Sequence, residues 1–190
     1  IIYEDENLLS ELDLFPSVNL IYSLREMSNL RFSLSRTIAR PSFKEKSIAQ
    51  IFDPVTSTTF IGNIDILPTK ILNYDLRWEL FQEDAQMYAI SLFYKDFTNP
   101  IELVVYNGAS PNDYTPKNVD EAKVYGIELE FRKNLEFISE SLSNFKLTFN
   151  TSIIRSEEIM DEKEYEGRTK SARSGELVSR KRELQGQSPY

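Results

Sequence analysis

The chain has 190 residues, of which 41% are hydrophobic and 27% charged, a balance typical of a folded domain and too apolar for wholesale disorder. Its formal net charge of −8 argues against a nucleic-acid partner, because a phosphate-binding surface needs a basic footprint. Cysteine and histidine are both absent, which excludes disulfides, thiolate chemistry and the commonest neutral-pH base and metal ligand.

Six segments alternate between apolar and polar residues, as strands with two different faces do. In chain order they cover 14–24, 29–38, 73–82, 86–106, 122–133 and 144–156. No long stretch has a helical period, so we predict an all-β chain whose strands form an antiparallel up-and-down meander. No apolar run approaches the about 20 residues of a membrane-spanning helix, although barrel strands give a much weaker signal.

The stretch NYDLRWELF, 73–81, shows the alternation most clearly. Its apolar parity comprises Tyr74, Leu76, Trp78 and Leu80, and its polar parity comprises Asn73, Asp75, Arg77 and Glu79. The pattern leaves open what the apolar face touches, since a protein core and a lipid bilayer both predict it.

The connections between the strands are sorted by length along the chain. The short ones cover 25–28, 82–85 and 134–143. The long ones cover 39–72, 107–121 and the tail 157–190. Short and long connections therefore alternate, which puts all short turns at one end of a meander, as in outer-membrane barrels with short periplasmic turns and long extracellular loops.

Single features within the segments allow more than one interpretation. Asn99-Pro100 breaks the fourth segment near its end, where proline does not cut a central ladder. Gly126 in mid-strand indicates a bulge, the close approach of another element to the lumen wall, or simply a small residue on a tight face. Tyr22, Trp78, Tyr88 and Tyr94 fit an aromatic girdle at the headgroup level, or the core of a soluble sheet.

The tail divides by charge. Acidic residues fill 157–167, and basic residues are concentrated in 168–182. The tail is interpreted either as a loop that attracts a charged ligand or as a solvated, mobile loop, and we favour the second. The carboxylates of 157–166 offer at most a weak site for a hard cation.

No catalytic constellation stands out. Glu128 and Glu130 share a face and resemble an acid/base pair, but any polar strand face provides such neighbours. Neither a G-x-S-x-G elbow nor a Gly-rich phosphate loop is present. We therefore predict no enzymatic activity, no cofactor, and no catalytic or metal-binding residue, and the ligand-binding residues stay unknown.

Five blocks of sequence, in order and at matching spacing, carry a resemblance that covers nearly the whole chain from about residue 14. They are LSRTIARPSFKE (34–45), GNIDILPTKILNYDLRWELF (62–81), ISLFYKDFTNPIE (90–102), AKVYGIELEFRK (122–133) and RELQGQSPY (182–190). Together they resemble the C-terminal barrel part of TonB-dependent outer-membrane receptors, particularly those of the Bacteroidetes type.

The resemblance implies a fragment of a transmembrane β-barrel of about 22 strands. Such receptors lie in the outer membrane of Gram-negative bacteria, bind a scarce nutrient (an iron chelate, a vitamin, a glycan or a peptide), and import it with energy from TonB. TonB acts on a plug domain, which is absent from 1–190. On this interpretation Tyr74, Leu76, Trp78 and Leu80 face lipid, and Asp75, Arg77 and Glu79 face the wet lumen.

Two further expectations concern the extent of the chain and its class. The chain begins at Ile1 without a signal peptide, so we interpret it as an internal fragment, and SPY (188–190) lacks the alternation of a closing strand. The alternative class is a soluble β-sandwich that binds carbohydrate or mediates adhesion.

Overall fold

The computed structural model describes residues 12–106, 113–160 and 162–188 of the chain. The expectation that 188–190 does not form a closing strand rests partly on Pro189 and Tyr190, which lie outside these ranges. Part of the expected loop 107–121 lies outside them as well.

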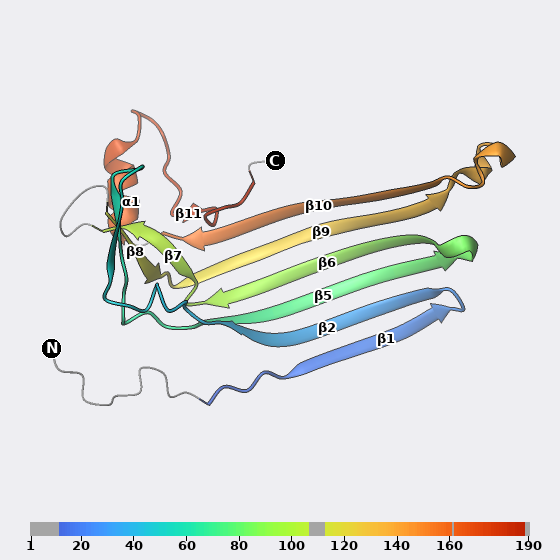
Figure 1. Ribbon diagram of the computed structural model, residues 1–190, viewed down its shortest axis with the longest axis horizontal. Coiled ribbons are helices and arrows are strands. Elements are labelled where there is room, and N and C mark those ends of the chain that lie inside the picture. Colours follow the sequence, from blue (N-terminus) through green and yellow to red (C-terminus); the bar gives the residue numbers. More distant parts are fainter. Residues whose placement is uncertain (1–11, 107–112, 161, 189–190) are drawn as a thin grey trace.

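The larger sheet is an antiparallel meander of long strands (Figure 1). Its strands, in spatial order, are β1 (Ser17–Arg25), β2 (Ser28–Ala39), β5 (Thr69–Gln82), β6 (Gln86–Thr98), β9 (Glu121–Asn134), β10 (Lys146–Ile159) and the short β11 (Lys181–Arg182). Each of the first six pairs with the next in antiparallel register. This confirms the predicted all-β, up-and-down fold class. The number of strands in a complete barrel stays a prediction.

The connections lie at opposite ends of the sheet according to length, as predicted (Figure 1). At one end, Glu26 and Met27 join β1 to β2, and η1 (Glu83–Ala85) joins β5 to β6. At the same end, η2 (Leu135–Phe137) and η3 (Glu140–Leu142) lie between β9 and β10. The remaining connections leave the other end, which we call the loop end.

Two expected long loops contain strands, which corrects the expectation of irregular connections. At the loop end, β3 (Gln50–Asp53), β4 (Thr58–Ile61), β8 (Asp113–Asn118) and β7 (Ile101–Val105) form a second, four-stranded sheet. Its order, β3-β4-β8-β7, joins 39–72 to 107–121 through a parallel β4–β8 pair. Strands this short carry no readable alternation, and the β4–β8 pair that holds the sheet together joins residues far apart in the sequence.

The predicted single strand 86–106 is wrong, because the chain turns after β6 and Ile101–Val105 joins the second sheet. Asn99 at the break has a positive φ of 54°, and Pro100 has no backbone N–H to continue the ladder. The backbone N–H of Asn99 instead donates to Asp120 O, at 3.2 Å, and that of Val119 to Pro100 O, at 2.9 Å.

The expected absence of helix is also corrected in the tail, where α1 (Glu162–Ser171) forms. Its stability comes from charge, because acidic residues lie in its first turn and basic residues in its last. Two i,i+4 ion pairs, Glu164–Arg168 and Glu166–Lys170, each have N···O distances of 3.2 Å. A helix without an apolar face gives no period to read. It is also too short and too polar to span a membrane, and no other helix among the described residues could do so.

The small hydrophobic core lies mainly under the second sheet. Ile66, Val119, Ala122 and Met160 are buried there, between the long strands and the loop-end elements. Few apolar side chains are buried along the long strands themselves, where only Ala89 and, near the loop end, Ala122 are buried among the described residues.

Candidate functional site

One face of the large sheet is apolar and exposed. A continuous row crosses six strands on this face through the register pairs, and it consists of Leu20, Phe32, Leu76, Leu92, Ile127 and Ile153. Leu76 remains 39% exposed and Leu92 48% exposed, although both lie in the middle of the sheet. We call this surface the apolar face. In water such a surface is unfavourable, so it requires an apolar environment.

Aromatic residues border the apolar face toward the loop end. Tyr74, Tyr94 and Tyr125 lie in one register row of β5, β6 and β9. The rings of Tyr74 and Tyr94 have centroids 6.0 Å apart. Of the four aromatic residues proposed for a girdle, only Tyr94 lies in this row; Tyr22 and Trp78 share another register row, and Tyr88 lies opposite Phe131. The girdle at a headgroup level stays a prediction.

The opposite face carries a network of ions and hydrogen bonds. Arg77 of β5 lies at its centre, with Nε 2.8 Å from Glu79 Oε1 and Nη2 2.5 Å from Glu130 Oε2. The Nη1 group of Arg77 donates to Ser91 Oγ at 2.9 Å, and Arg31 Nε donates to Glu79 Oε2 at 2.7 Å. Glu79 is only 7% exposed. The charged face is therefore ordered and partly shielded while the apolar face is open, which is the reverse of a water-soluble sheet.

The two carboxylates considered as an acid/base pair have different surroundings. Glu130 is held by Arg77 in the network. Glu128 lies two residues away on the same face and lines a cavity of about 480 Å³ together with Arg77, Ser91 and Phe93. The ion pair gives Glu130 a structural role, so the geometry does not favour a catalytic pair.

Gly126 provides space for an aromatic ring on the charged face. The register of β9 with both neighbours is continuous at this residue, so the bulge interpretation is wrong. A Cβ on Gly126 would lie 2.7 Å from Cζ of Phe93, its cross-strand partner, and 2.5 Å from the carbonyl oxygen of Ile153. Both contacts come from adjacent strands of the same sheet, so the structure fits a small residue on a tight face.

Charges from three loop-end elements converge on Arg182 of β11. Its Nη2 group contacts Glu102 of β7 at 2.5 Å and pairs with Glu158 of β10, and its Nε lies 2.9 Å from Glu164 of α1. The Arg182 side chain is only 11% exposed. Most of the tail is exposed, as expected for a solvated loop, but Arg182 is shielded and ties the tail to both sheets. Its mobility stays a prediction. A charge run shows which residues are present but not how they are shielded, so this site could not be predicted from the sequence.

Burial raises the pKa of Glu102, whereas the hydrogen bonds with Glu158 and Arg182 and from the Gln185 backbone N–H lower it. The second effect is larger, and the pKa of Glu102 lies below its ordinary value. Glu102 is therefore ionised at neutral pH and helps to fix Arg182.

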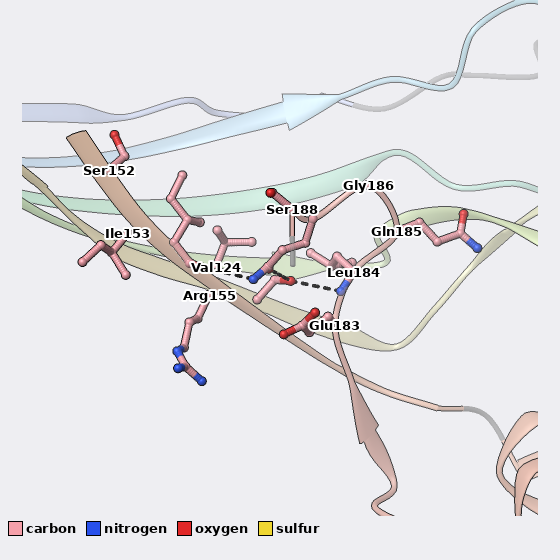
Figure 2. Close-up of a pocket in the computed structure, with 12 residues that line it drawn as sticks. Val124, Ser152, Ile153, Arg155, Glu183, Leu184, Gln185, Gly186 and Ser188 are labelled. Atoms are coloured by element: carbon pink, nitrogen blue, oxygen red, sulfur yellow. Dashed lines mark hydrogen bonds between the residues drawn. The ribbon is translucent and has the colours of Figure 1, made fainter. Parts of the chain in front are cut away.

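The segment 183–188 folds back along β10 and encloses a cavity of about 580 Å³ (Figure 2). The backbone N–H of Leu184 donates to Ser156 Oγ at 3.0 Å, and Gln187 Nε2 donates to Ile154 O at 3.1 Å. Val124 and Ile154 line this cavity and also the one beside Phe93, so the two adjoin on the charged face. These cavities are the candidate places for a ligand along the sheet.

The acidic tail does not form a metal site in the described part of the chain, where no group of three or more acidic, His or Cys side chains has the required arrangement. Instead, its carboxylates pair with cations: Glu157 with Lys181 at 2.8 Å and Glu162 with Arg180 at 2.5 Å.

Comparison with known proteins agrees with this architecture. The family described as "TonB dependent receptor-like, beta-barrel" matches residues 5–176. A search of curated proteins finds no significant match.

Two similar solved structures are receptors of Pseudomonas aeruginosa. A point mutant of the ferric enterobactin receptor PfeA, in complex with enterobactin, has 21% identity and a TM-score of 0.56 over 74% of this chain. The siderophore receptor PirA has 16% identity and a TM-score of 0.55 over 76% of this chain. The match covers 22% of the PfeA chain and 30% of the PirA chain, so it indicates a shared fold over part of each receptor. The chain belongs to the family of TonB-dependent receptor β-barrels.

Proposed function

We propose that this chain is part of the barrel wall of an outer-membrane receptor that binds a scarce nutrient at the cell surface and imports it with energy from TonB. The apolar face contacts lipid of the outer membrane of a Gram-negative bacterium, and the charged face lines the lumen. TonB acts through a plug domain in another part of the receptor. The contribution of these residues is binding and guidance of the nutrient, without covalent chemistry.

The reversal of burial between the two faces carries this proposal. Leu76 is 39% exposed and Glu79 is 7% exposed, although they are only three positions apart on β5. An environment that is apolar outside and polar inside explains both values, because strands of a membrane barrel turn apolar residues to lipid and polar residues to the lumen.

A soluble β-sandwich explains the faces less well. A sandwich needs a second sheet packed face to face, about 10 Å away, over the apolar side. The second sheet of this chain lies beyond the ends of the long strands instead, as β7 and β8 show in Figure 1. This position leaves the apolar face open to lipid and suits a sheet of extracellular loops.

The nutrient class stays a proposal among iron chelates, vitamins, glycans and peptides, and so does the Bacteroidetes-type subfamily. The two similar structures named above are a ferric enterobactin receptor and a siderophore receptor, which makes ferric chelates the first nutrients to test. The loop-end elements and the two adjoining cavities are the surfaces that we expect to contact the nutrient.

Deletion of the gene in the producing bacterium tests the function. We expect the receptor in the outer-membrane fraction of the parent strain, and we expect the deletion strain to lose growth on one limiting nutrient. Growth should be restored by the wild-type gene only while TonB is present. Recovery of the protein in the soluble fraction, or restored growth without TonB, would contradict the proposal.

A further inference from the structure

The turn between β9 and β10 carries three exposed apolar side chains, whereas Met27 is the one apolar residue of the two-residue β1–β2 turn. The β9–β10 turn covers residues 135–145 and contains η2 and η3. Phe137 is 68% exposed, Ile138 is 62% exposed and Phe145 is 60% exposed. In Figure 1 the turn lies beyond the ends of β9 and β10, far from the loop end.

The apolar face extends further on this hairpin than on its neighbour. On β5 the apolar parity ends at Leu80, because Gln82 follows, and Gln82 pairs with Gln86 of β6. Lys133 of β9 lies at the same border, with Nζ 3.1 Å from Gln82 Oε1. Beyond this border the backbone N–H of Leu135 donates to Phe145 O at 3.0 Å. Leu135 and Phe145 therefore extend the apolar face past Gln82 and Lys133.

The size of this extension fits a lipid headgroup layer. Two strand residues advance about 6.5 Å along the strand, or about 5 Å along the membrane normal at the usual tilt. The headgroup layer on one side of a bilayer is about 5–8 Å thick. Phe145 and the turn that follows Leu135 therefore reach the layer in which aromatic and amphipathic groups are most favourable.

The backbone of the turn is also suited to this layer, because many of its N–H groups are already bonded within the chain. Asn134 Oδ1 accepts from the N–H of Glu136 at 2.8 Å, and the 3-10 turns provide further bonds. The internally bonded N–H groups are those of Leu135, Glu136, Ile138, Leu142, Ser143 and Phe145. Internal bonding lowers the cost of leaving bulk water.

We propose that the β9–β10 turn, residues 135–145, is an interfacial anchor whose apolar side chains lie in the phospholipid headgroup layer on the short-turn side of the membrane. The proposal rests on the proposed function, which orients the apolar face toward lipid. The occupant is phospholipid, because the anchor continues the surface that already faces the bilayer. The polar residues of the turn, such as Glu136 and Glu140, remain in water.

Spin labels on single cysteines in the full receptor test this placement. The chain supplies no cysteine of its own, so each label site is a new substitution: Phe137→Cys, Ile138→Cys or Phe145→Cys, with Glu140→Cys as the matched control. The receptor is reconstituted in vesicles of phosphatidylethanolamine and phosphatidylglycerol. Collision rates with oxygen, which concentrates in lipid, and with a water-soluble nickel chelate report the depth of each label.

We expect the labels at 137, 138 and 145 to collide more with oxygen than with the nickel chelate, and the label at 140 to show the opposite. Labels at the three apolar sites that collide mainly with the nickel chelate lie in water and overturn the anchor. Immobile labels that are shielded from both reagents indicate a protein partner and overturn it as well.

A label at Leu76→Cys separates failure of the anchor from failure of the proposed function. If Leu76 reports lipid and the turn reports water, only the anchor is wrong. If Leu76 itself reports water, the barrel-wall proposal is wrong too.

Discussion

Arg77 and Glu130 meet on the charged face of the sheet, with Nη2 and Oε2 2.5 Å apart, although 53 positions separate them in the chain. The pair reaches across β6, since β5 and β9 are both neighbours of that strand and Ser91 of β6 accepts a third bond from Arg77. One guanidinium therefore ties three strands of the proposed lumen wall.

Substitution of Arg77 by Leu should destabilise the receptor. Glu79 is buried and loses one of its two cationic partners, so we expect a loss of about 1–3 kcal/mol in the free energy of unfolding. Urea titration of the refolded receptor, followed by its electrophoretic mobility, measures this loss. Lys95→Leu is the matched control, because Lys95 lies on the same face outside this network. Equal stability of Arg77→Leu and wild type would show that the network contributes nothing.

Gly126→Ala should destabilise the sheet through overpacking. The added Cβ would lie 2.5 Å from the carbonyl oxygen of Ile153 and 2.7 Å from Cζ of Phe93, and overpacking of this kind costs about 1–3 kcal/mol. Phe93→Leu in the same chain should recover only part of the loss, since the Ile153 carbonyl is backbone. The same unfolding titration distinguishes these variants, with Ser152→Ala as the control on the neighbouring strand. Full recovery of stability by Phe93→Leu would show that the added methyl group clashes only with the Phe93 ring and not with the Ile153 carbonyl.

Acid should release the tail from the loop end. The pKa of Glu102 is lower in the folded chain than in the unfolded chain, so its contribution to stability is complete above the unfolded value. This contribution disappears as the pH falls through the lowered folded value. Glu158 acts in the opposite direction at higher pH, because burial raises its pKa to about 8 and its protonation stabilises the folded chain as the pH falls toward the ordinary value of 4.5. Limited proteolysis of the tail with an acid-tolerant protease, used at equal activity at each pH, should therefore show increasing cleavage as the pH falls from 4.5 to about 3.

Glu102→Gln tests the cause of that pH dependence. The variant should be cleaved more than wild type at neutral pH, and its cleavage should change less with pH. Glu162→Gln, which alters an exposed ion pair of the same tail, should behave like wild type. An unchanged pH profile in Glu102→Gln would assign the effect to other carboxylates.

The parts of the fold that could be predicted are those with local patterns. Alternation in 73–82 predicts β5 because side chains on a strand have a period of two. The strands of the second sheet could not be predicted in this way, since Gln50–Asp53 and Thr58–Ile61 have only four residues each, and the sheet depends on the pairing of Thr58–Ile61 with Asp113–Asn118, far along the chain. The helix Glu162–Ser171 could not be predicted from periodicity, because it has no apolar stripe.

The candidate site was predictable only as a face. The parity of Arg77, Glu79 and Glu130 places them on the polar side, but the sequence does not show that Glu79 is buried between two arginines. Arg182 lies in a basic run that usually indicates solvent, and only the tertiary structure shows the carboxylates of Glu102, Glu158 and Glu164 around it. Local charge patterns carry no information about such convergence.

The orientation of the apolar face toward lipid is tested most directly by comparing Leu76→Arg with Ser33→Arg in the full receptor refolded into bilayers. The two sites lie on adjacent strands, and Ser33, opposite Asp75, belongs to the charged face. We predict that Leu76→Arg lowers the free energy of unfolding by about 2–4 kcal/mol if Leu76 lies near the midplane, whereas Ser33→Arg changes it by less than about 1 kcal/mol. Equal stability of the two variants, or a greater loss with Ser33→Arg, would contradict the assignment of the faces.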